Sequence, residues 1–477
     1  MRVATFLAQA SCLLSFATGA LAARQLGNLG NVKFTADLWA ANITGARNLV
    51  FDAVGDLLVI QTDPNSSTNA LDGVAGSGLL FPAVVGLVDF GTIDSPRVKT
   101  YPIVQNTSLP QGFIPNHGIE IIDNYLYLSN ETSIWRWPYR AGQRRSVSAS
   151  SAQLFTSNMP WKVQGLGHTR TLLYRAQDDK FFVADGLDLN IDYTDNRSDI
   201  RYFPVRSAPI PAGGWDWYSR PIWALGLRNA VGLAIQPVTN WLWETDQGID
   251  DLYREDLGGD IHNDNPPDEL NLLDNWSKPE TVNAQKPYHF GFPYCWTEGN
   301  ITNASSTVGP HKAGDQWAQY LNRSDYTDAY CKDPKKNIKP LALVQAHAAP
   351  LGIQFFNGTG CVNTPNCNSK RNPFTCNYTG QLFFTAHGAD NRDRSVGHFF
   401  GTFPFSSKTK LPSRPLAAPP ANYDELYGET DQTLCTVSFS GQNCWRPTMI
   451  KFDRFGRLFI TENNRGEVWR LSIDGTA

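Results

Sequence analysis

The sequence predicts an all-β fold, specifically a six-bladed β-propeller. Six times along the chain an arginine or a histidine opens a short apolar run, and in most cases a turn and a second apolar run follow. Self-similarity of this kind indicates one supersecondary unit repeated in a ring. The composition agrees, because 14 Trp, 17 Tyr and 26 Phe favour strands while 39 Gly and 30 Pro favour turns.

Each repeat is expected to begin at its basic or histidine residue, and we call these six residues the anchors: Arg47, His117, His168, Arg228, His347 and Arg446. Second strands are predicted at LLVI, LYLS, FFVA, LWET, LFFTAHGAD and LFIT, the fifth displaced by an insertion that carries cysteines. The last run, EVWRLSI, is expected to pair with a strand near Phe34 and close the ring, which would protect exposed edges. The PLAAPPANYDE stretch from Pro415 is interpreted as a surface loop between blades five and six.

Residues 1–22 are predicted to be a secretory signal peptide and residues 23–477 a single propeller domain. Arg2 precedes the apolar stretch SCLLSFA, and Ala20-Leu21-Ala22 fits a cleavage site for small residues. A membrane anchor is the alternative, but the stretch is too short and too rich in Ala and Ser.

Glycosylation sequons and cysteines both favour secretion. Seven cysteines remain after removal of the signal, so one thiol is left over, and we expect Cys295–Cys331, Cys435–Cys444 and one bond within the group Cys361, Cys367 and Cys376. None has the C-x-x-C spacing of a zinc site. Eleven Asn-x-Ser/Thr acceptors are expected on exposed loops: Asn42, Asn65, Asn106, Asn130, Asn196, Asn275, Asn300, Asn303, Asn322, Asn357 and Asn377.

If the repeats are equivalent, the six anchors converge at one mouth of the channel. The chain as a whole carries a net charge of −4, which disfavours a general nucleic-acid role, yet this ring would be cationic. Clustered like charge is costly unless an anion compensates it, and arginine suits polycarboxylates or phosphates. The alternative is that each anchor caps its own strand or pairs with a local acid.

Two further features carry potential chemistry. His168, between a glycine turn and a strand, is either a structural histidine or a general base that the neighbouring Arg170 could keep neutral. The acidic segment from Asp246 to Glu269 is either a solvated loop or a Ca²⁺ site, although it lacks EF-hand spacing. Hydrolase elbows, HExxH and P-loops are absent, and GVAGSGLLF lacks the third glycine of a dinucleotide fingerprint.

Several segments together resemble the soluble quinoprotein sugar dehydrogenases, the glucose/sorbosone dehydrogenase group. They are GLRNAVGLAIQP, LWETDQGIDD, NPPDELNLL, FGFPYCW, HAAPLGIQFF and RPTMIKFDRFGRLFITE. The signal peptide, the sequons and AHAAPLG are most similar to the fungal pyranose dehydrogenases that use pyrroloquinoline quinone (PQQ). The resemblance covers essentially the mature chain.

The resemblance implies that PQQ and Ca²⁺ lie at the channel mouth and that a sugar hydroxyl is oxidised. It assigns His168 as the catalytic base and His117 to the substrate. It implies metal ligands at Gly248, Ile249 and Asp250. The residues implied for PQQ binding are Arg47, Arg228, Asn229, His347, Arg392 and Arg446.

Two departures from the family pattern matter. Bacterial glucose enzymes place a lysine against PQQ from blade five, where this chain reads TAHGADNRDRSVGH, so Arg392 is expected to substitute. We expect neither the haem domain nor the cellulose-binding module of some fungal members. Electrons are therefore expected to pass to a separate acceptor such as a cytochrome linked to oxidative polysaccharide degradation.

We expect a monomer without membrane or nucleic-acid partners. The competing functions are a calcium-dependent lactonase or esterase and a non-catalytic binding propeller.

Overall fold

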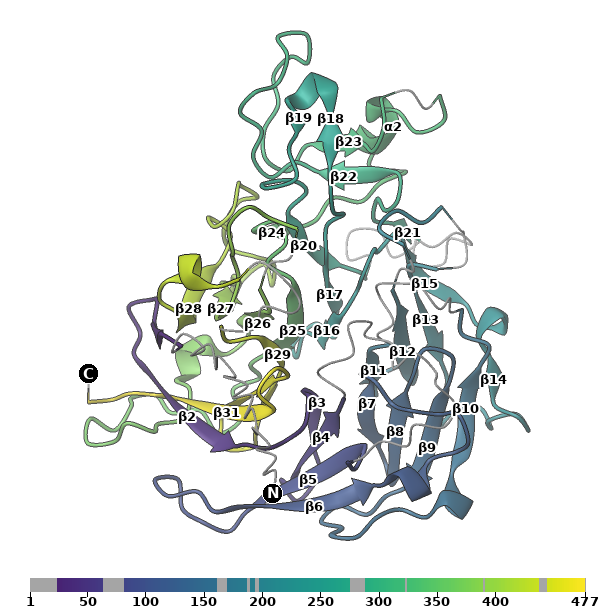
Figure 1. Cartoon of the computed structure of the whole chain (residues 1–477), viewed down its shortest axis with the longest axis vertical. Helices are drawn as coiled ribbons and strands as arrows, with labels where there is room; N and C mark the ends of the chain where they lie inside the picture. Colours follow the sequence, from purple (N-terminus) through teal and green to yellow (C-terminus); the bar gives the residue numbers. More distant parts are fainter. Residues whose placement is uncertain are drawn as a thin grey trace, which may run out of the picture.

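The computed structural model describes residues 24–62, 81–160, 170–186, 189–193, 197–274, 288–321, 324–388, 391–436 and 444–476. Six mainly antiparallel sheets of four or five strands surround a common axis, as Figure 1 shows from one end. The predicted six-bladed propeller is therefore confirmed.

The strands of the first three blades run from the axis outwards in the following order. Blade one contains β3 (Ala46–Phe51), β4 (Leu57–Gln61), β5 (Val84–Asp89) and β6 (Val98–Val104). Blade two contains β7 (Ile119–Ile122), β8 (Tyr125–Ser129), β9 (Ile134–Pro138), β10 (Gln153–Ser157) and β14 (Trp215–Asp216). Blade three contains β11 (Leu172–Arg175), β12 (Lys180–Asp185), β13 (Asp199–Phe203), β15 (Ile222–Leu225) and β21 (Tyr288–His289).

The other three blades follow the same plan. Blade four contains β16 (Gly232–Ile235), β17 (Leu242–Asp246), β20 (Asp268–Leu272) and β24 (Ala342–Val344). Blade five contains β25 (Pro350–Phe355), β26 (Leu382–Ala386), β27 (Phe399–Phe403), β28 (Asp424–Glu429) and β1 (Leu26–Asn28). Blade six contains β29 (Pro447–Phe452), β30 (Leu458–Glu462), β31 (Glu467–Ile473) and β2 (Phe34–Ala40).

The second strand of every blade lies where the sequence predicts it. These strands are buried along nearly their whole length, as for Leu382–Ala386 and Leu458–Glu462. A strand covered on both faces requires a continuous apolar run rather than an alternating one, which is what the sequence provides. The blades pack against each other through these faces, and the resulting apolar clusters span neighbouring blades.

The ring is closed by pairing the two ends of the chain. Strand β2 pairs with β31 in an antiparallel register that sets Phe34 opposite Ile473, as predicted. Strand β2 therefore forms the outer edge of blade six. One loop prediction is wrong: the stretch from Pro415 connects β27 to β28 and so lies within blade five. The error arises because β28, the fourth strand of blade five, has the sequence DELYGE, which is not a continuous apolar run.

Neighbouring blades are joined at the start of their inner strands by side chains that bond to backbone carbonyls. In blade four, the Thr245 hydroxyl donates to the Pro350 carbonyl of blade five over 3.1 Å. The other five junctions have equivalent donors and acceptors: Asn48 to His117, Ser129 to Arg170, Thr171 to Val231, Thr385 to Thr448 and Thr461 to Arg47. This ring of hydrogen bonds holds the anchor positions of adjacent blades at one level.

Glycine at the start of an inner strand permits this close approach. A Cβ atom on Gly118 would lie 2.2 Å from the Ser129 hydroxyl and 2.3 Å from the Arg170 carbonyl. A Cβ on Gly232 would meet the Thr245 hydroxyl at 2.3 Å. Both distances are impossible contacts, so the junctions of blades two and four depend on glycine.

An accessory segment extends from blade four at the top of Figure 1. It contains the short pairs β18 (Tyr253–Arg254) with β19 (Gly259–Asp260) and β22 (Cys295–Thr297) with β23 (Gln316–Ala318), and helix α2 (Asp328–Lys332). Its own apolar cluster includes Ile249, Phe292 and Trp296.

The disulfide predictions are confirmed. Cys295 bonds to Cys331 in the accessory segment and Cys435 to Cys444, while the third bond joins Cys361 to Cys376. Cys367 is a free and exposed thiol. Three disulfides indicate an oxidising environment.

The sequons differ in their exposure. Asn42, Asn300, Asn303, Asn357 and Asn377 are exposed, as an acceptor must be. Asn130 is buried and its side-chain oxygen accepts bonds from the backbone of Thr132 and Ser133, so it is a turn residue and not an acceptor. Four others, at positions 65, 196, 275 and 322, lie outside the described residues.

Within the described part of the chain, no helix has the length and apolarity needed to span a bilayer.

Candidate functional site

The anchors of five blades lie in or just before the inner strands that surround the axis. Arg47 lies in β3, Arg446 directly precedes β29, and His117, Arg228 and His347 precede β7, β16 and β25 by a few residues. The labels of these five strands and of β11 form a ring around the centre of Figure 1. His168 falls in residues 161–169, outside the described residues, so its placement is untested.

Two arginine–histidine pairs from four blades form a buried cluster. Arg47 donates from Nε to Nδ1 of His117 over 3.1 Å, and Arg446 donates from Nη2 to Nδ1 of His387 over 2.9 Å. All four side chains are at most 8% exposed. We call Arg47, His117, His387 and Arg446 the Arg–His cluster.

The protonation states of this cluster follow from its hydrogen bonds. A guanidinium group only donates, so each histidine accepts at Nδ1 and is neutral with its proton on Nε2. Burial, reinforced by Arg47, lowers the pKa of His117 well below its usual range. Burial and the charges of Arg446 and Arg47 do the same to His387. The Nε2 atom of His117 is buried and finds no partner among the described residues.

The two arginines are held close together without a carboxylate beside Arg47. Burial, followed by the charge of Arg446, lowers the pKa of Arg47 to about 10. Among the described residues, no acidic side chain forms an ion pair with Arg47. Buried like charges are costly, so the cluster fits an anion far better than it fits a purely structural role.

A second cluster surrounds Arg228 on blade four. Its guanidinium donates to the Gly248 carbonyl, to the side-chain oxygen of Asn190 over 2.8 Å and to Asp250 over 2.8 Å. Asn190 also accepts from the backbone N–H of Asp250. We call the oxygens of Asn190, Gly248 and Asp250 the oxygen nest. Burial favours a higher pKa for Asp250, but His347 and Arg228 hold it below its usual value.

Two buried aspartates fix the backbone of this cluster. Asp246 accepts from the backbone N–H groups of Arg228 and Asn229 at 2.8 and 2.7 Å. Asp268 accepts from Gly248 and Ala349 at 2.9 and 2.8 Å and so ties the blade-four turn to blade five. These carboxylates therefore orient both anchor turns.

His347 and Arg392 complete the blade-five side of the site. His347 has a φ of 62°, its Nε2 lies 2.9 Å from the His262 carbonyl, and its Nδ1 lies 3.4 Å from Asp250. Arg392 donates to the Ala346 carbonyl and pairs with Asp264 at 3.3 Å. Its Nε atom is buried and has no partner among the described residues.

The structure thus brings most of the predicted residues into two groups. Arg47, His117 and Arg446 share one cluster, while Arg228, Asn229, Gly248, Ile249, Asp250 and His347 gather around the oxygen nest, with Arg392 beside Ala346. Arg170, expected next to His168, forms a buried ion pair with Asp185 at 3.0 Å.

Sequence reasoning missed His387, Asn190, Asp246 and Asp268 as individual site residues. His387 directly follows the second strand of blade five within the LFFTAHGAD segment, so its position near the anchors could have been inferred. No sequence pattern pointed to Asn190, because it lies in a loop whose path depends on the tertiary fold. The two aspartates were seen only as members of an acidic segment.

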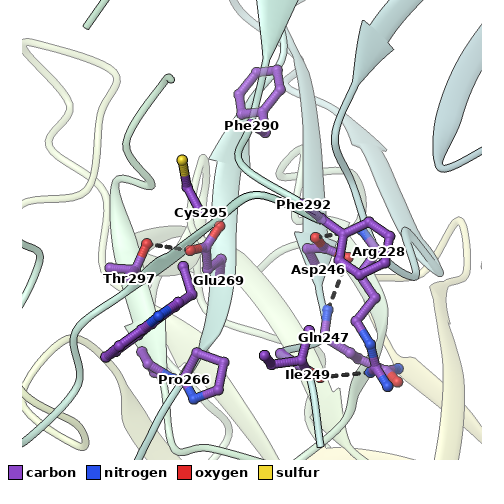
Figure 2. Close-up of a pocket in the computed structure, with 13 residues that line it drawn as sticks. Arg228, Asp246, Gln247, Ile249, Pro266, Glu269, Phe290, Phe292, Cys295 and Thr297 are labelled. Carbon is purple, nitrogen blue, oxygen red and sulfur yellow. Dashed lines mark hydrogen bonds between the residues drawn. The ribbon is translucent and has the colours of Figure 1, made fainter. Parts of the chain in front are cut away.

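A narrow pocket lies behind the Gly248–Ile249 turn. Figure 2 shows Phe290 at one end, Glu269 and Thr297 on one side, and Asp246, Gln247 and Ile249 towards Arg228 on the other. Trp296, Phe292, Cys295 and two prolines complete its walls.

The chain belongs to the TrAA12-like family, whose model matches residues 94–474. A pyrroloquinoline quinone-dependent sugar dehydrogenase of Hypocrea jecorina (strain QM6a) is 26% identical over 454 residues, covering 91% of this chain and 88% of that protein. An uncharacterized protein of Borreliella burgdorferi is 27% identical over 355 residues, 73% of each chain.

Solved structures share the fold. The calcium structure of a Trichoderma reesei enzyme of carbohydrate-active family AA12 aligns with a TM-score of 0.74 at 23% identity, covering 96% of this chain and 100% of that one. The holo form of the pyranose dehydrogenase PQQ domain from Coprinopsis cinerea aligns with a TM-score of 0.74 at 22% identity, covering 94% and 97%.

Proposed function

We propose that this chain is a secreted PQQ-dependent sugar dehydrogenase that oxidises a hydroxyl of a pyranose or related sugar. The observation that carries the proposal is the Arg–His cluster, in which Arg47 lies buried beside a second arginine with no acidic partner among the described residues. Its similarity to a sugar dehydrogenase with this cofactor supports the same conclusion.

The residues of the site fit PQQ, a flat ring system with three carboxylates. Arg47 and Arg446 are suited to carboxylates, since guanidinium groups bind them through parallel hydrogen bonds. The buried Nε2–H of His117 is a donor in need of an acceptor. Arg392 has a comparable unused donor at Nε. The carboxylates of such a ligand would accept hydrogen bonds from these unused donors.

Each residue then has a distinct role. Arg47 and Arg446 would hold carboxylates of PQQ, and His347, Arg392, Arg228 and Asn229 would provide further contacts to it. His117 orients the substrate side of the site. His168 accepts the proton of the sugar hydroxyl as a general base. PQQ, when bound, provides the acceptor for the hydride.

The proposed Ca²⁺ ligands are the carbonyls of Gly248 and Ile249 and the carboxylate of Asp250, two of which belong to the oxygen nest. This donor set is all oxygen, which suits Ca²⁺. In this structure Arg228 donates to Gly248 and Asp250, so bound Ca²⁺ would replace these hydrogen bonds. The described residues hold no cluster of three or more acidic, histidine or cysteine side chains fit for a metal, so backbone carbonyls must contribute. Bound Ca²⁺ would act as a Lewis acid.

The three disulfides and the exposed sequons support secretion of a glycoprotein. We further propose that the enzyme is a monomer and passes electrons to a separate acceptor, such as a cytochrome linked to oxidative polysaccharide degradation.

Dye reduction by the purified protein, measured with a panel of sugars, tests the function. Turnover that requires both PQQ and Ca²⁺ is the expected result. Hydrolysis of lactones without PQQ would instead identify a hydrolase, and absence of both cofactor binding and turnover would identify a binding propeller.

A further inference from the structure

The two pairs of the Arg–His cluster differ at the second ring nitrogen of their histidines. Nε2 of His117 has no partner among the described residues, whereas Nε2 of His387 lies 3.1 Å from the side-chain oxygen of Asn463. Asn463 lies in the turn that joins β30 to β31 of blade six. Of the two histidines, His387 is therefore the one that is held at both of its ring nitrogens.

The contact with Arg446 determines the direction of each hydrogen bond in this chain of three residues. A guanidinium group has donors only, so Nδ1 of His387 accepts from Nη2 over 2.9 Å. The Nε atom of Arg446 also approaches Nε2 of the ring, but at 3.5 Å this contact is much weaker. The single proton of the neutral ring is therefore on Nε2, and Asn463 presents its amide oxygen, not its amide nitrogen, to the ring.

This arrangement requires that His387 stays neutral. Its side chain and that of Arg446 are buried, at 7% and 2% exposed. Burial, reinforced by the charges of Arg446 and Arg47, lowers the pKa of His387 well below its usual range. A protonated ring would turn an N–H donor towards the guanidinium group and lose the bond. Asn463 suits a neutral ring, because an amide oxygen accepts a hydrogen bond without the negative charge that would favour protonation.

The chain of hydrogen bonds passes from blade six to blade five and back. Arg446 precedes β29 and Asn463 follows β30, both in blade six, while His387 directly follows β26 of blade five. An imidazole that is bonded at one nitrogen can still turn about its side-chain bonds, whereas bonds at both nitrogens fix its plane and its tautomer. The acceptor that faces Arg446 is therefore fixed in position.

We infer that Asn463 is a positioning residue, which acts through His387 to fix the guanidinium group of Arg446 at the mouth of the propeller. His387 then supports the site, and His117, whose Nε2–H is unused, is the histidine of the cluster that can donate to a ligand. The identity of that ligand as PQQ rests on the proposed function. The bond directions rest only on the contacts of His387 with its two partners.

Nitrogen NMR of the full chain, labelled at histidine and measured without PQQ, tests the bond directions. At neutral pH we expect His387 to be uncharged with its proton on Nε2. His387→Asn assigns the signal by removing it, and this variant should fold because the asparagine oxygen can accept from Arg446 in place of Nδ1. A proton on Nδ1, or a charged ring, in the wild type would overturn the inference.

A double-mutant cycle measured by PQQ titration tests the positioning role. Asn463→Leu removes the acceptor at nearly constant size and should weaken PQQ binding about three- to tenfold, the effect of one impaired hydrogen bond. In the Arg446→Met background the same change should alter the affinity by less than about twofold, because no guanidinium group remains to be positioned. An equal loss in both backgrounds, or no loss in either, would overturn the inference.

Asn124→Leu is the control, because Asn124 is exposed in the turn between β7 and β8, at the end of blade two away from His117. Thermal melts confirm folding, and Asn463→Ala repeats the test without added apolar bulk. A purely structural role would lower the melting temperature of these variants and leave their PQQ affinity unchanged. If the wild type binds no PQQ, the proposed function fails, and the tautomer of His387, measured without PQQ, decides the inference.

Discussion

Arg47 donates a hydrogen bond from Nε to Nδ1 of His117 over 3.1 Å, and this bond joins blade one to blade two at the mouth of the propeller. Since arginine cannot accept, the bond fixes His117 as the neutral tautomer with a proton on Nε2. Arg446 and His387 repeat the relationship between blades six and five. The two pairs place the guanidinium groups of Arg47 and Arg446 in one buried cluster.

Replacement of Arg47 tests its proposed contact with the cofactor. Arg47→Met should weaken PQQ binding by about 10- to 100-fold, the size of one lost charge-assisted hydrogen bond. The melting temperature should not fall, because the change removes one of two buried like charges. Absorbance titration with PQQ gives the affinity, and the surface variant Arg206→Met is the control. An unchanged affinity would place Arg47 outside the cofactor site.

His168→Ala tests the assignment of the general base. Turnover should drop by about two to four orders of magnitude, the usual contribution of general-base catalysis, while PQQ still binds. Stopped-flow reduction of bound PQQ by sugar measures the step directly. His311→Ala in the accessory segment is the control, since His311 pairs with Glu298 away from the mouth. Near-normal turnover in the His168 variant would refute the assignment.

Thr245→Val tests the ring of hydrogen bonds between blades. The change keeps the shape of the side chain but leaves the buried Pro350 carbonyl without its donor, so the free energy of unfolding should fall by about 1–3 kcal/mol. Thr100→Val on the exposed part of β6 should have little effect. Equal urea midpoints for the two variants would mean that the junction contributes nothing to stability.

The buried histidines predict loss of stability in mild acid. Burial and the charge of Arg446 lower the pKa of His398 from 6.5 to about 4. Its contribution is therefore intact above pH 6.5 and is lost as the pH falls towards 4, because the unfolded chain takes up a proton that the fold excludes. His117 and His387 act in the same direction.

Urea denaturation at a series of pH values measures this linkage. His398→Gln should flatten the decline between pH 6.5 and 4 relative to the wild type. Parallel pH profiles for the two proteins would show that His398 does not resist protonation in the folded state.

The architecture was accessible from the sequence because buried propeller strands impose long apolar runs, such as those of β26 and β30, at recurring intervals. Ring closure through Phe34 and the Cys295–Cys331 and Cys435–Cys444 bonds followed from the same periodicity and from cysteine spacing, whereas the exact partners of the third bond stayed open. The loop from Pro415 was misplaced because the strand that follows it, β28, has the mixed sequence DELYGE and no apolar run to mark it.

The sequence located five of the six anchors at the starts of inner strands, but it gave less information on residues elsewhere in the candidate site. Anchors such as Arg47 and Arg446 are fixed by their position in the repeat. Asn190 reaches Arg228 from a loop with no repeat pattern, and Asp268 acts through backbone N–H groups of two blades. Such contacts depend on the tertiary fold, which local sequence does not encode.

The central claim is that arginines and histidines from separate blades form one cradle for a planar tricarboxylate. Absorbance titration of the purified chain with PQQ, with and without Ca²⁺, tests it most directly. A saturable spectral change at one PQQ per chain, tightened by Ca²⁺, is the predicted result. The absence of any saturable change in correctly folded protein, with or without Ca²⁺, would contradict the claim.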